Sequence, residues 1–140
     1  MKKIYILNGP NLNLLGKRET AIYGVKTFED FLNELKKKYT SIELHYFQSN
    51  SEHELIDFLH KIGFEKDSAI LFNPGAYTHQ SYALGDAIAG IETPVLEIHL
   101  SNTFAREAFR KHSLISQKCV GTILGLGLKG YELGIQYFMP

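Results

Sequence analysis

The chain has a single cysteine, a balanced charge and no long hydrophobic run. Having only Cys119 excludes an internal disulfide framework and a cysteine-based zinc site, and we expect this residue to be buried in a strand. The formal net charge is +0, and the longest run of like charge, Lys36 to Lys38, falls where a helix is expected to end. These features argue against a basic nucleic-acid surface and against a membrane patch.

Every hydrophobic segment is shorter than the ~18 residues that a membrane span requires. The first residues also lack the pattern of a signal peptide, so we expect a cytoplasmic protein. With 44% hydrophobic residues, the 140 residues suffice for one globular domain with its own core. No repeat or linker divides residues 1–140.

Arginine is scarce, since only three of the 15 Lys and Arg residues are arginines. They are Arg18, Arg106 and Arg110. Lysine suffices for solubility, whereas a guanidinium binds carboxylates or phosphates through paired hydrogen bonds. Each arginine is therefore a candidate ligand for an anionic substrate, and a structural ion pair is the alternative for each.

Strand-like and helix-like segments alternate along the chain. Apolar runs predict strands at residues 4–7, 42–47, 69–72, 95–99 and 120–124. Apolar residues at helical spacing predict helices after Thr27 and Ser51, each of which opens a capping box. Further helices are expected at about 79–91, in part of 103–117 and after 130. This alternation predicts an α/β fold, a parallel sheet with helices on both faces.

The preferred topology is flavodoxin-like, with five parallel strands in the order 2-1-3-4-5. In such sheets a ligand binds beyond the carboxyl ends of the strands, where the strand order reverses. That point lies here between the first and third strands. The segments richest in polar residues follow the first, third and fourth strands, so we expect them to converge on one site.

The segment after the first strand, residues 8–24, combines asparagines with Arg18 and Tyr23. It contains neither G-x-G-x-x-G nor the Lys-Ser/Thr pair of a P-loop, so a nucleotide phosphate is not the expected ligand. An arginine near a phenol can lower the phenol's pKa from its usual ~10, which would make a tyrosinate base available. An ordinary half-buried aromatic is the alternative for Tyr23.

The fourth strand ends in Glu97-Ile98-His99. Residues two apart on a strand share a face, so the carboxylate can hold one imidazole nitrogen and prepare the ring for acid–base work. A core histidine with satisfied hydrogen bonds is the alternative. Asn73 and His79 follow the third strand at the same rim, unless Asn-Pro-Gly marks only a turn. The chain has neither a zinc-binding H-E-x-x-H motif nor a G-x-S-x-G elbow.

Five segments together resemble the type II 3-dehydroquinate dehydratases. They are residues 8–24, 48–50, 73–79, 97–110 and 125–131. They span nearly the whole chain in the order in which the family has them. The resemblance implies a flavodoxin-like fold, one catalytic domain over residues 1–140, no metal and no cofactor. It also implies a homo-oligomer, a dodecamer built as a tetramer of trimers.

Members of that family are lyases of the shikimate pathway, which leads to the aromatic amino acids. They dehydrate 3-dehydroquinate to 3-dehydroshikimate by trans elimination through an enolate. The resemblance makes Tyr23 the base, Arg18 the group that keeps it ionised, and Asn11 the holder of a water at the enolate oxygen. His99, oriented by Glu97, would protonate the departing hydroxyl. Substrate binding would fall to Asn73, His79, Leu100, Ser101 and Arg110, with Asp86 reaching a neighbouring subunit's site.

Four residues depart from the family pattern: Thr20, His53, Lys111 and Leu126. They bear on packing and on the closure of the loop after the first strand more than on the reaction. Two other hypotheses remain. A flavodoxin-like cofactor or nucleotide binder would carry a phosphate-cradling loop there and would show a flavin absorbance. A phosphoacceptor domain would carry clustered acids at the strand ends and would be labelled by acetyl phosphate.

Overall fold

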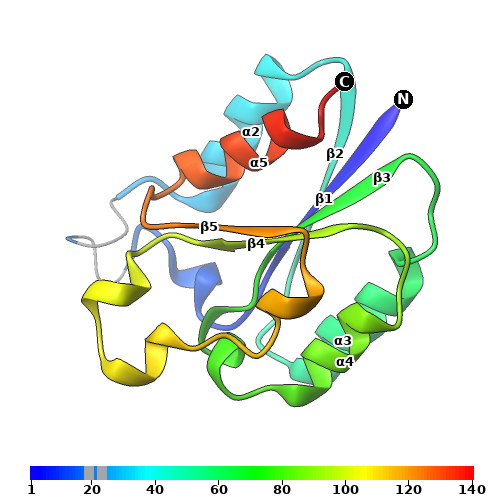
Figure 1. The fold of residues 1–140 in the computed structure, drawn as a ribbon. Helices are drawn as coiled ribbons and strands as arrows, with labels where there is room; N and C mark the ends of the chain where they lie inside the picture. Colours follow the sequence, from blue (N-terminus) through cyan, green and yellow to red (C-terminus); the bar gives the residue numbers. More distant parts are fainter. Residues whose placement is uncertain (18–20, 22–24) are drawn as a thin grey trace.

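The computed structural model describes residues 1–17, 21 and 25–140, in which a parallel sheet lies between two layers of helices (Figure 1). The sheet has five strands in the order β2-β1-β3-β4-β5. Their bounds are β1 Lys2–Asn8, β2 Ile42–Gln48, β3 Ser68–Asn73, β4 Val95–His99 and β5 Gly121–Leu124. The predicted α/β class and the flavodoxin-like strand order are confirmed.

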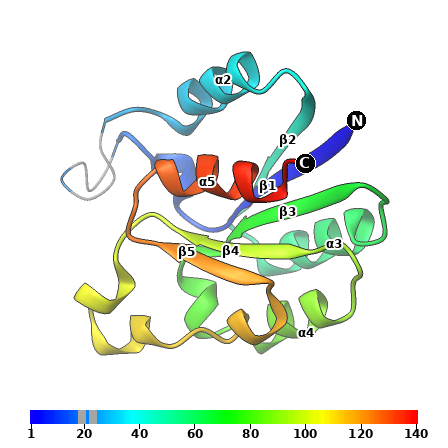
Figure 2. The same ribbon diagram turned by 45° about the horizontal axis from the view of Figure 1, so that its top comes forward.

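Two pairs of helices cover the two faces of the sheet (Figure 2). Helices α2 (Phe28–Lys38) and α5 (Lys129–Phe138) enclose one apolar cluster, and α3 (Glu52–Ile62) and α4 (Tyr82–Ala89) enclose the other. All residues of β3 and β4 are buried, as expected for strands that are covered on both faces. Because all the strand pairs are parallel, the carboxyl ends of the strands lie along one edge of this covered sheet.

The two predicted capping positions begin their helices. Thr27 Oγ1 accepts the Asp30 N–H (3.2 Å) at the start of α2, and Ser51 Oγ accepts the Glu54 N–H (3.5 Å) at the start of α3. In the second box the Glu54 carboxylate accepts from the Ser49 hydroxyl (3.0 Å). The sequence signal for a helix start is thus correct even where the carboxylate turns to another partner.

One prediction of local structure is off at its bounds, and one is wrong. The helix expected at about 79–91 is α4, which begins three residues later and ends two earlier, because the Ser81 hydroxyl accepts the Leu84 N–H (3.0 Å) and caps the helix after the 3-10 turn η2 (Gly75–His79). Cys119 is only partly buried and precedes β5, because its N–H closes a turn on the Ser116 carbonyl (3.1 Å).

The segment between β4 and β5 contains short 3-10 turns instead of a longer helix. They are η3 (Thr103–Ala105), η4 (Ala108–Lys111) and η5 (Ser116–Lys118), and a further one, η1 (Leu12–Leu14), follows β1. The helix expected after residue 130 is α5. Over the described ranges, no helix has both the length and the apolar character needed to cross a membrane.

Candidate active site

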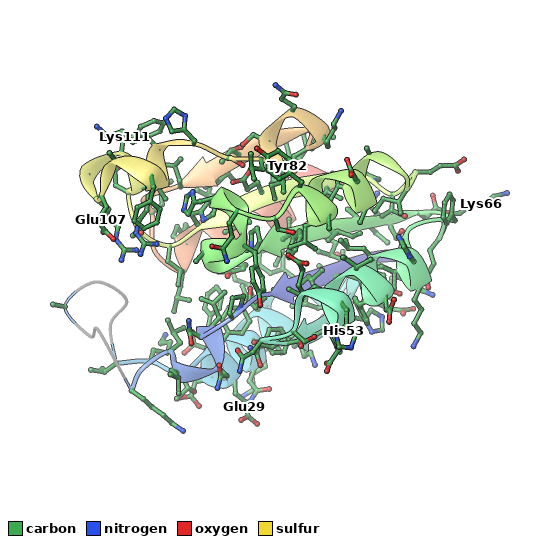
Figure 3. All side chains as sticks on the ribbon, turned by 90° about the horizontal axis from the view of Figure 1, so that it is seen from below. Glu29, His53, Lys66, Tyr82, Glu107 and Lys111 are labelled. Atoms are coloured by element: carbon green, nitrogen blue, oxygen red, sulfur yellow. The ribbon has the colours of Figure 1, made fainter. Side chains whose placement is uncertain are left out.

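A pocket lies beyond the carboxyl ends of β1, β3 and β4, where the predicted polar segments converge. Glu107 and Lys111 mark this end of the molecule, and Lys66 marks the opposite end (Figure 3). The pocket has a volume of about 150 Å³, which is room for about five water molecules at ~30 Å³ each. Seven predicted residues line it: Asn11, Asn73, His79, His99, Leu100, Ser101 and Arg110.

Asn73 is fixed at the floor of the pocket by a buried network. The ends of β1 and β3 lie side by side, with Asn8 opposite Asn73. The Tyr131 hydroxyl donates to Asn8 Oδ1 (2.7 Å) and accepts from Asn73 Nδ2 (2.9 Å), while Asn73 Oδ1 accepts the Gly75 N–H (3.1 Å). Complete burial raises the pKa of Tyr131, so the phenol stays protonated and the network keeps one pattern.

Glu97 and His99 form a close pair on the pocket side of β4. They share one face of the strand, as predicted, and Glu97 Oε2 lies 2.5 Å from His99 Nε2. Glu97 is 1% exposed and His99 is 7% exposed. A carboxylate accepts, so Nε2 carries the proton of this bond and Nδ1 is the nitrogen left for another partner.

The buried carboxyl of Glu97 is held in its ionised form. Burial by itself raises its pKa, but the hydrogen bond and charge of His99 and the hydroxyls of Ser116 and Ser113 together outweigh burial and lower the pKa of Glu97. The Glu97 carboxylate is thus negative at neutral pH, and it can stabilise a protonated imidazole beside the pocket.

His79 faces His99 across the pocket rim. The ring centroids of His79 and His99 are 6.4 Å apart, and the Phe109 ring lies nearly perpendicular to that of His79 with its centroid 5.7 Å away. His79 Nδ1 donates to the His112 carbonyl (2.7 Å), which leaves Nε2 as the acceptor of the neutral ring. Partial burial, and the nearby charges of His99 and Arg110, lower the pKa of His79 against the opposing hydrogen bond.

The pocket mouth is cationic. Arg106 and Arg110 both line it, and Arg106 Nη1 donates to Ser101 Oγ (3.2 Å). Glu107 lies outside the lining and accepts from Arg110 Nε (3.1 Å). Paired guanidiniums beside a serine hydroxyl suit a carboxylate ligand. Arg106 and Arg110 thus both lie near Glu107, as the ion-pair alternative predicts, and their place in the pocket lining keeps them as candidate ligands for an anionic substrate.

Asn11 stands at the start of η1 with a positive φ of 70°, a conformation that asparagine tolerates better than most residues. Its backbone N–H donates to Asn50 Oδ1 (3.0 Å). This hydrogen bond ties the loop after β1 to the loop after β2, and it leaves the exposed Asn11 side chain at the pocket lining.

Of the remaining predicted residues, two are not covered by the described part of the chain and one lies away from the pocket. Arg18 and Tyr23 lie outside the described residues, and so does Thr20, which differs from the family pattern. Asp86 is exposed on α4 and is absent from the pocket lining. The predicted contact of Asp86 is with the site of a neighbouring subunit, and it stays a prediction.

Other residues at the site gave little signal in the sequence. Arg106 stood out by its scarcity alone, whereas Thr78, Ser113 and Ser116 are common residue types in segments without strong periodicity. All three of these hydroxyls lie within hydrogen-bond distance of the Glu97 carboxylate. Over the described residues, no group of three or more His, Cys, Asp or Glu is arranged to hold a metal ion.

Comparison with known proteins is consistent with this geometry. A family model described as "Dehydroquinase class II" matches residues 2–139. The chain is 51% identical over 141 residues to a 3-dehydroquinate dehydratase of Bacillus pumilus, covering 99% of this chain and 95% of that one. A similar enzyme of Caldicellulosiruptor bescii is 50% identical over 137 residues, covering 96% and 94%. The crystal structure of a type II dehydroquinase from Butyrivibrio crossotus superposes with a TM-score of 0.93 at 43% identity, covering 98% and 97%.

Proposed function

Because the chain belongs to the type II 3-dehydroquinate dehydratase family, we propose that its pocket binds 3-dehydroquinate and converts it to 3-dehydroshikimate and water. The observation that carries the proposal is the buried Glu97–His99 pair at the edge of a cationic pocket. A pocket of about 150 Å³ with amide, imidazole and guanidinium groups in its lining suits a small hydroxylated ring acid.

His99 is the acid of the reaction. The C1 hydroxyl of the substrate leaves poorly unless it receives a proton, and an imidazolium is a suitable donor. Glu97 engages Nε2, so Nδ1 delivers the proton and the leaving group departs as water. The negative charge of Glu97 stabilises the protonated ring before the transfer.

Tyr23 is the base. Its phenolate oxygen takes a proton from C2, next to the ketone, and the C2–H electron pair moves into the enolate. Collapse of the enolate forms the C1–C2 double bond and breaks the C1–O bond. Arg18 keeps Tyr23 ionised, and Asn11, whose backbone is tied to Asn50, holds a water at the enolate oxygen.

The remaining pocket residues bind the substrate. Arg110 and the backbone at Leu100 and Ser101 take the carboxylate, and Asn73 and His79 take ring hydroxyls through amide and imidazole groups. Asp86 of one subunit contributes to the site of a neighbour within a trimer, and four trimers form a dodecamer. The exposed position of Asp86 on α4 is compatible with such a contact.

The proposal is tested by mixing the purified protein, freed of metal by chelation, with 3-dehydroquinate and recording ultraviolet absorbance. A conjugated enone should accumulate, and its rate should be unchanged by borohydride treatment in the presence of substrate, because no Schiff base forms. A flat trace from folded protein would contradict the proposed reaction.

Substituting Tyr23→Phe tests the base. We expect kcat to fall by at least about 10³-fold with KM changed less than about threefold, because the phenolate removes a proton only in the transition state. Steady-state kinetics and calorimetric binding of the product check both parts. Full activity of Tyr23→Phe would refute the assignment.

A further inference from the structure

The carboxylate of Glu97 is surrounded by hydroxyls that are not part of the pocket lining. Oε1 accepts from Ser116 Oγ (2.6 Å) and Ser113 Oγ (2.9 Å). Oε2 lies 3.1 Å from Ser113 Oγ and 3.3 Å from Thr78 Oγ1, in addition to the imidazole of His99. Every direction in which the carboxylate can accept is thus occupied.

The hydroxyl of Ser113 has only one direction in which to donate. Its oxygen accepts the backbone N–H of Ile115 (3.2 Å) and of Ser116 (3.1 Å). Those two bonds use its lone pairs, so its single proton points to Glu97. Within the described part of the chain, Glu97 is also the only hydrogen-bond partner of the Ser116 hydroxyl.

The segment that carries these two serines, residues 112–116, also hydrogen-bonds His79, the other histidine in the pocket lining. The His112 carbonyl accepts from His79 Nδ1 (2.7 Å), and the Leu114 N–H donates to the Thr78 carbonyl (2.8 Å). One stretch of backbone between η4 and η5 therefore sets the position of both rings, one directly and the other through Glu97.

Resting on the proposed function, we propose that Ser113 and Ser116 are positioning residues for the His99 acid. Their hydroxyls fix the Glu97 carboxylate and withdraw part of its charge, so that the carboxylate holds the His99 ring in one orientation. Neither serine lines the pocket, so both act through Glu97 and not on the substrate.

A structural role alone does not account for Ser116. The turn at residues 113–116 is stabilised by two backbone N–H groups that donate to the Ser113 oxygen. The Ser116 hydroxyl makes no hydrogen bond within this turn and donates to the Glu97 carboxylate. The other ionisable groups near the pair are His79 on η2, Arg110 on η4 and the partly buried Cys119. None of these three supplies a hydrogen bond to Glu97.

Steady-state kinetics test the proposal with Ser116→Ala, Ser116→Thr and a control, Ser68→Ala. Ser68 is 3% exposed, begins β3 at the opposite end of the sheet and donates to the Glu65 carbonyl (2.7 Å). We expect Ser116→Ala to lower kcat about tenfold with KM within about twofold, because a hydrogen bond to a charged group is lost. Ser116→Thr should restore most of kcat, and Ser68→Ala should leave it unchanged.

A kcat within twofold of wild type for Ser116→Ala would overturn the proposal, as would an equal loss in Ser68→Ala. The Ser113→Ala variant also loses a turn, so its kcat is compared only after its urea midpoint matches that of Ser68→Ala. If it does not match, the Ser116 series decides.

Histidine NMR gives a readout that does not depend on turnover. In ¹⁵N-histidine-labelled protein without substrate, His99→Gln identifies the Nε2–H proton resonance bound to Glu97. Ser116→Ala should shift this resonance downfield, because the carboxylate regains the charge that the hydroxyl withdrew. An unmoved resonance would contradict the proposal even if the enone assay succeeds, whereas a flat enone trace with the expected shift would refute only the reaction.

Discussion

Among the residues that the structure describes, two glutamates are buried, Glu97 at the pocket and Glu132 on α5 beside the end of α2, and their surroundings differ. Glu97 accepts from neutral hydroxyls and one imidazole. Glu132, 9% exposed, accepts from the ammonium of Lys38, from that of Lys129 (2.9 Å) and from the Tyr39 hydroxyl (2.7 Å). Two lysines hold one carboxylate as a fixed charge, whereas an imidazole gives the other a partner that can exchange a proton.

The electrostatics of the two sites follow from these partners. Hydrogen bonds from Lys38, Lys129 and Tyr39 lower the pKa of Glu132 to about 2. The pKa of Glu97 is also lowered, although deeper burial opposes the shift there. Both carboxylates are therefore ionised at neutral pH, and they differ in that Glu97 has an imidazole as a partner where Glu132 has two ammonium groups.

Removing the exchangeable partner should have the largest effect. In His99→Gln the amide can still donate to Glu97 but cannot deliver a proton at Nδ1. We expect kcat to fall about 10³-fold, within the range usual for a lost general acid, while the free energy of unfolding changes by less than about 1 kcal/mol. The enone assay measures kcat, and urea unfolding measures the free energy of unfolding. A wild-type kcat in folded His99→Gln would contradict the role of His99 as the acid.

Removing the fixed charge should affect stability alone. The ionised Glu132 stabilises the fold above the ordinary carboxyl pKa of ~4.3, and this contribution is lost as the pH falls towards about 2. Glu132→Gln should lower the free energy of unfolding at pH 7 by about 1–2 kcal/mol, less than the full shift implies, because Lys38 and Lys129 are more than half exposed.

Urea unfolding of wild type and Glu132→Gln between pH 7 and pH 3 measures this difference. It should be constant down to about pH 5 and narrow below it. A difference that persists undiminished at pH 3 would assign the effect to packing between α2 and α5 instead of charge.

A third carboxylate, Glu107, is exposed, and we expect its removal to have the smallest effect of the three. It pairs with Arg110 (3.1 Å) and lies 3.9 Å from Arg106 at the pocket mouth. Glu107→Gln should lower KM for an anionic substrate about twofold at low ionic strength and leave kcat unchanged, because an exposed ion pair competes only weakly. A rise in KM would mean that Glu107 organises the arginines.

The fold was predictable from the sequence because each element carries its own local signal. Buried strands such as β3 appear as short apolar runs, and the starts of α2 and α3 carry capping residues. The start of α4 lies three residues after the predicted one, His79, because Ser81 caps the helix there. Cys119 was misplaced because a turn and a strand end look alike over a few residues.

The site was predictable where chemistry follows strand geometry. Alternation along β4 places Glu97 and His99 on one face, and the strand order places the end of β3, with Asn73, next to the end of β4 at the same pocket. The contacts of Ser113 and Ser116 with Glu97 join positions 16 and 19 residues apart through a path of turns. These turns have no periodic sequence pattern, so the two contacts could not be predicted from the sequence.

The most direct test of the account compares Glu97→Gln with Glu132→Gln in one enone assay at saturating 3-dehydroquinate. Each variant replaces a buried carboxylate by an amide of the same shape. We expect Glu97→Gln to lose about a hundredfold in kcat, because the protonated imidazole loses its counter-charge, and Glu132→Gln to keep wild-type kcat. Equal rates in the two folded variants would contradict the claim that the surroundings of Glu97 make it part of the acid.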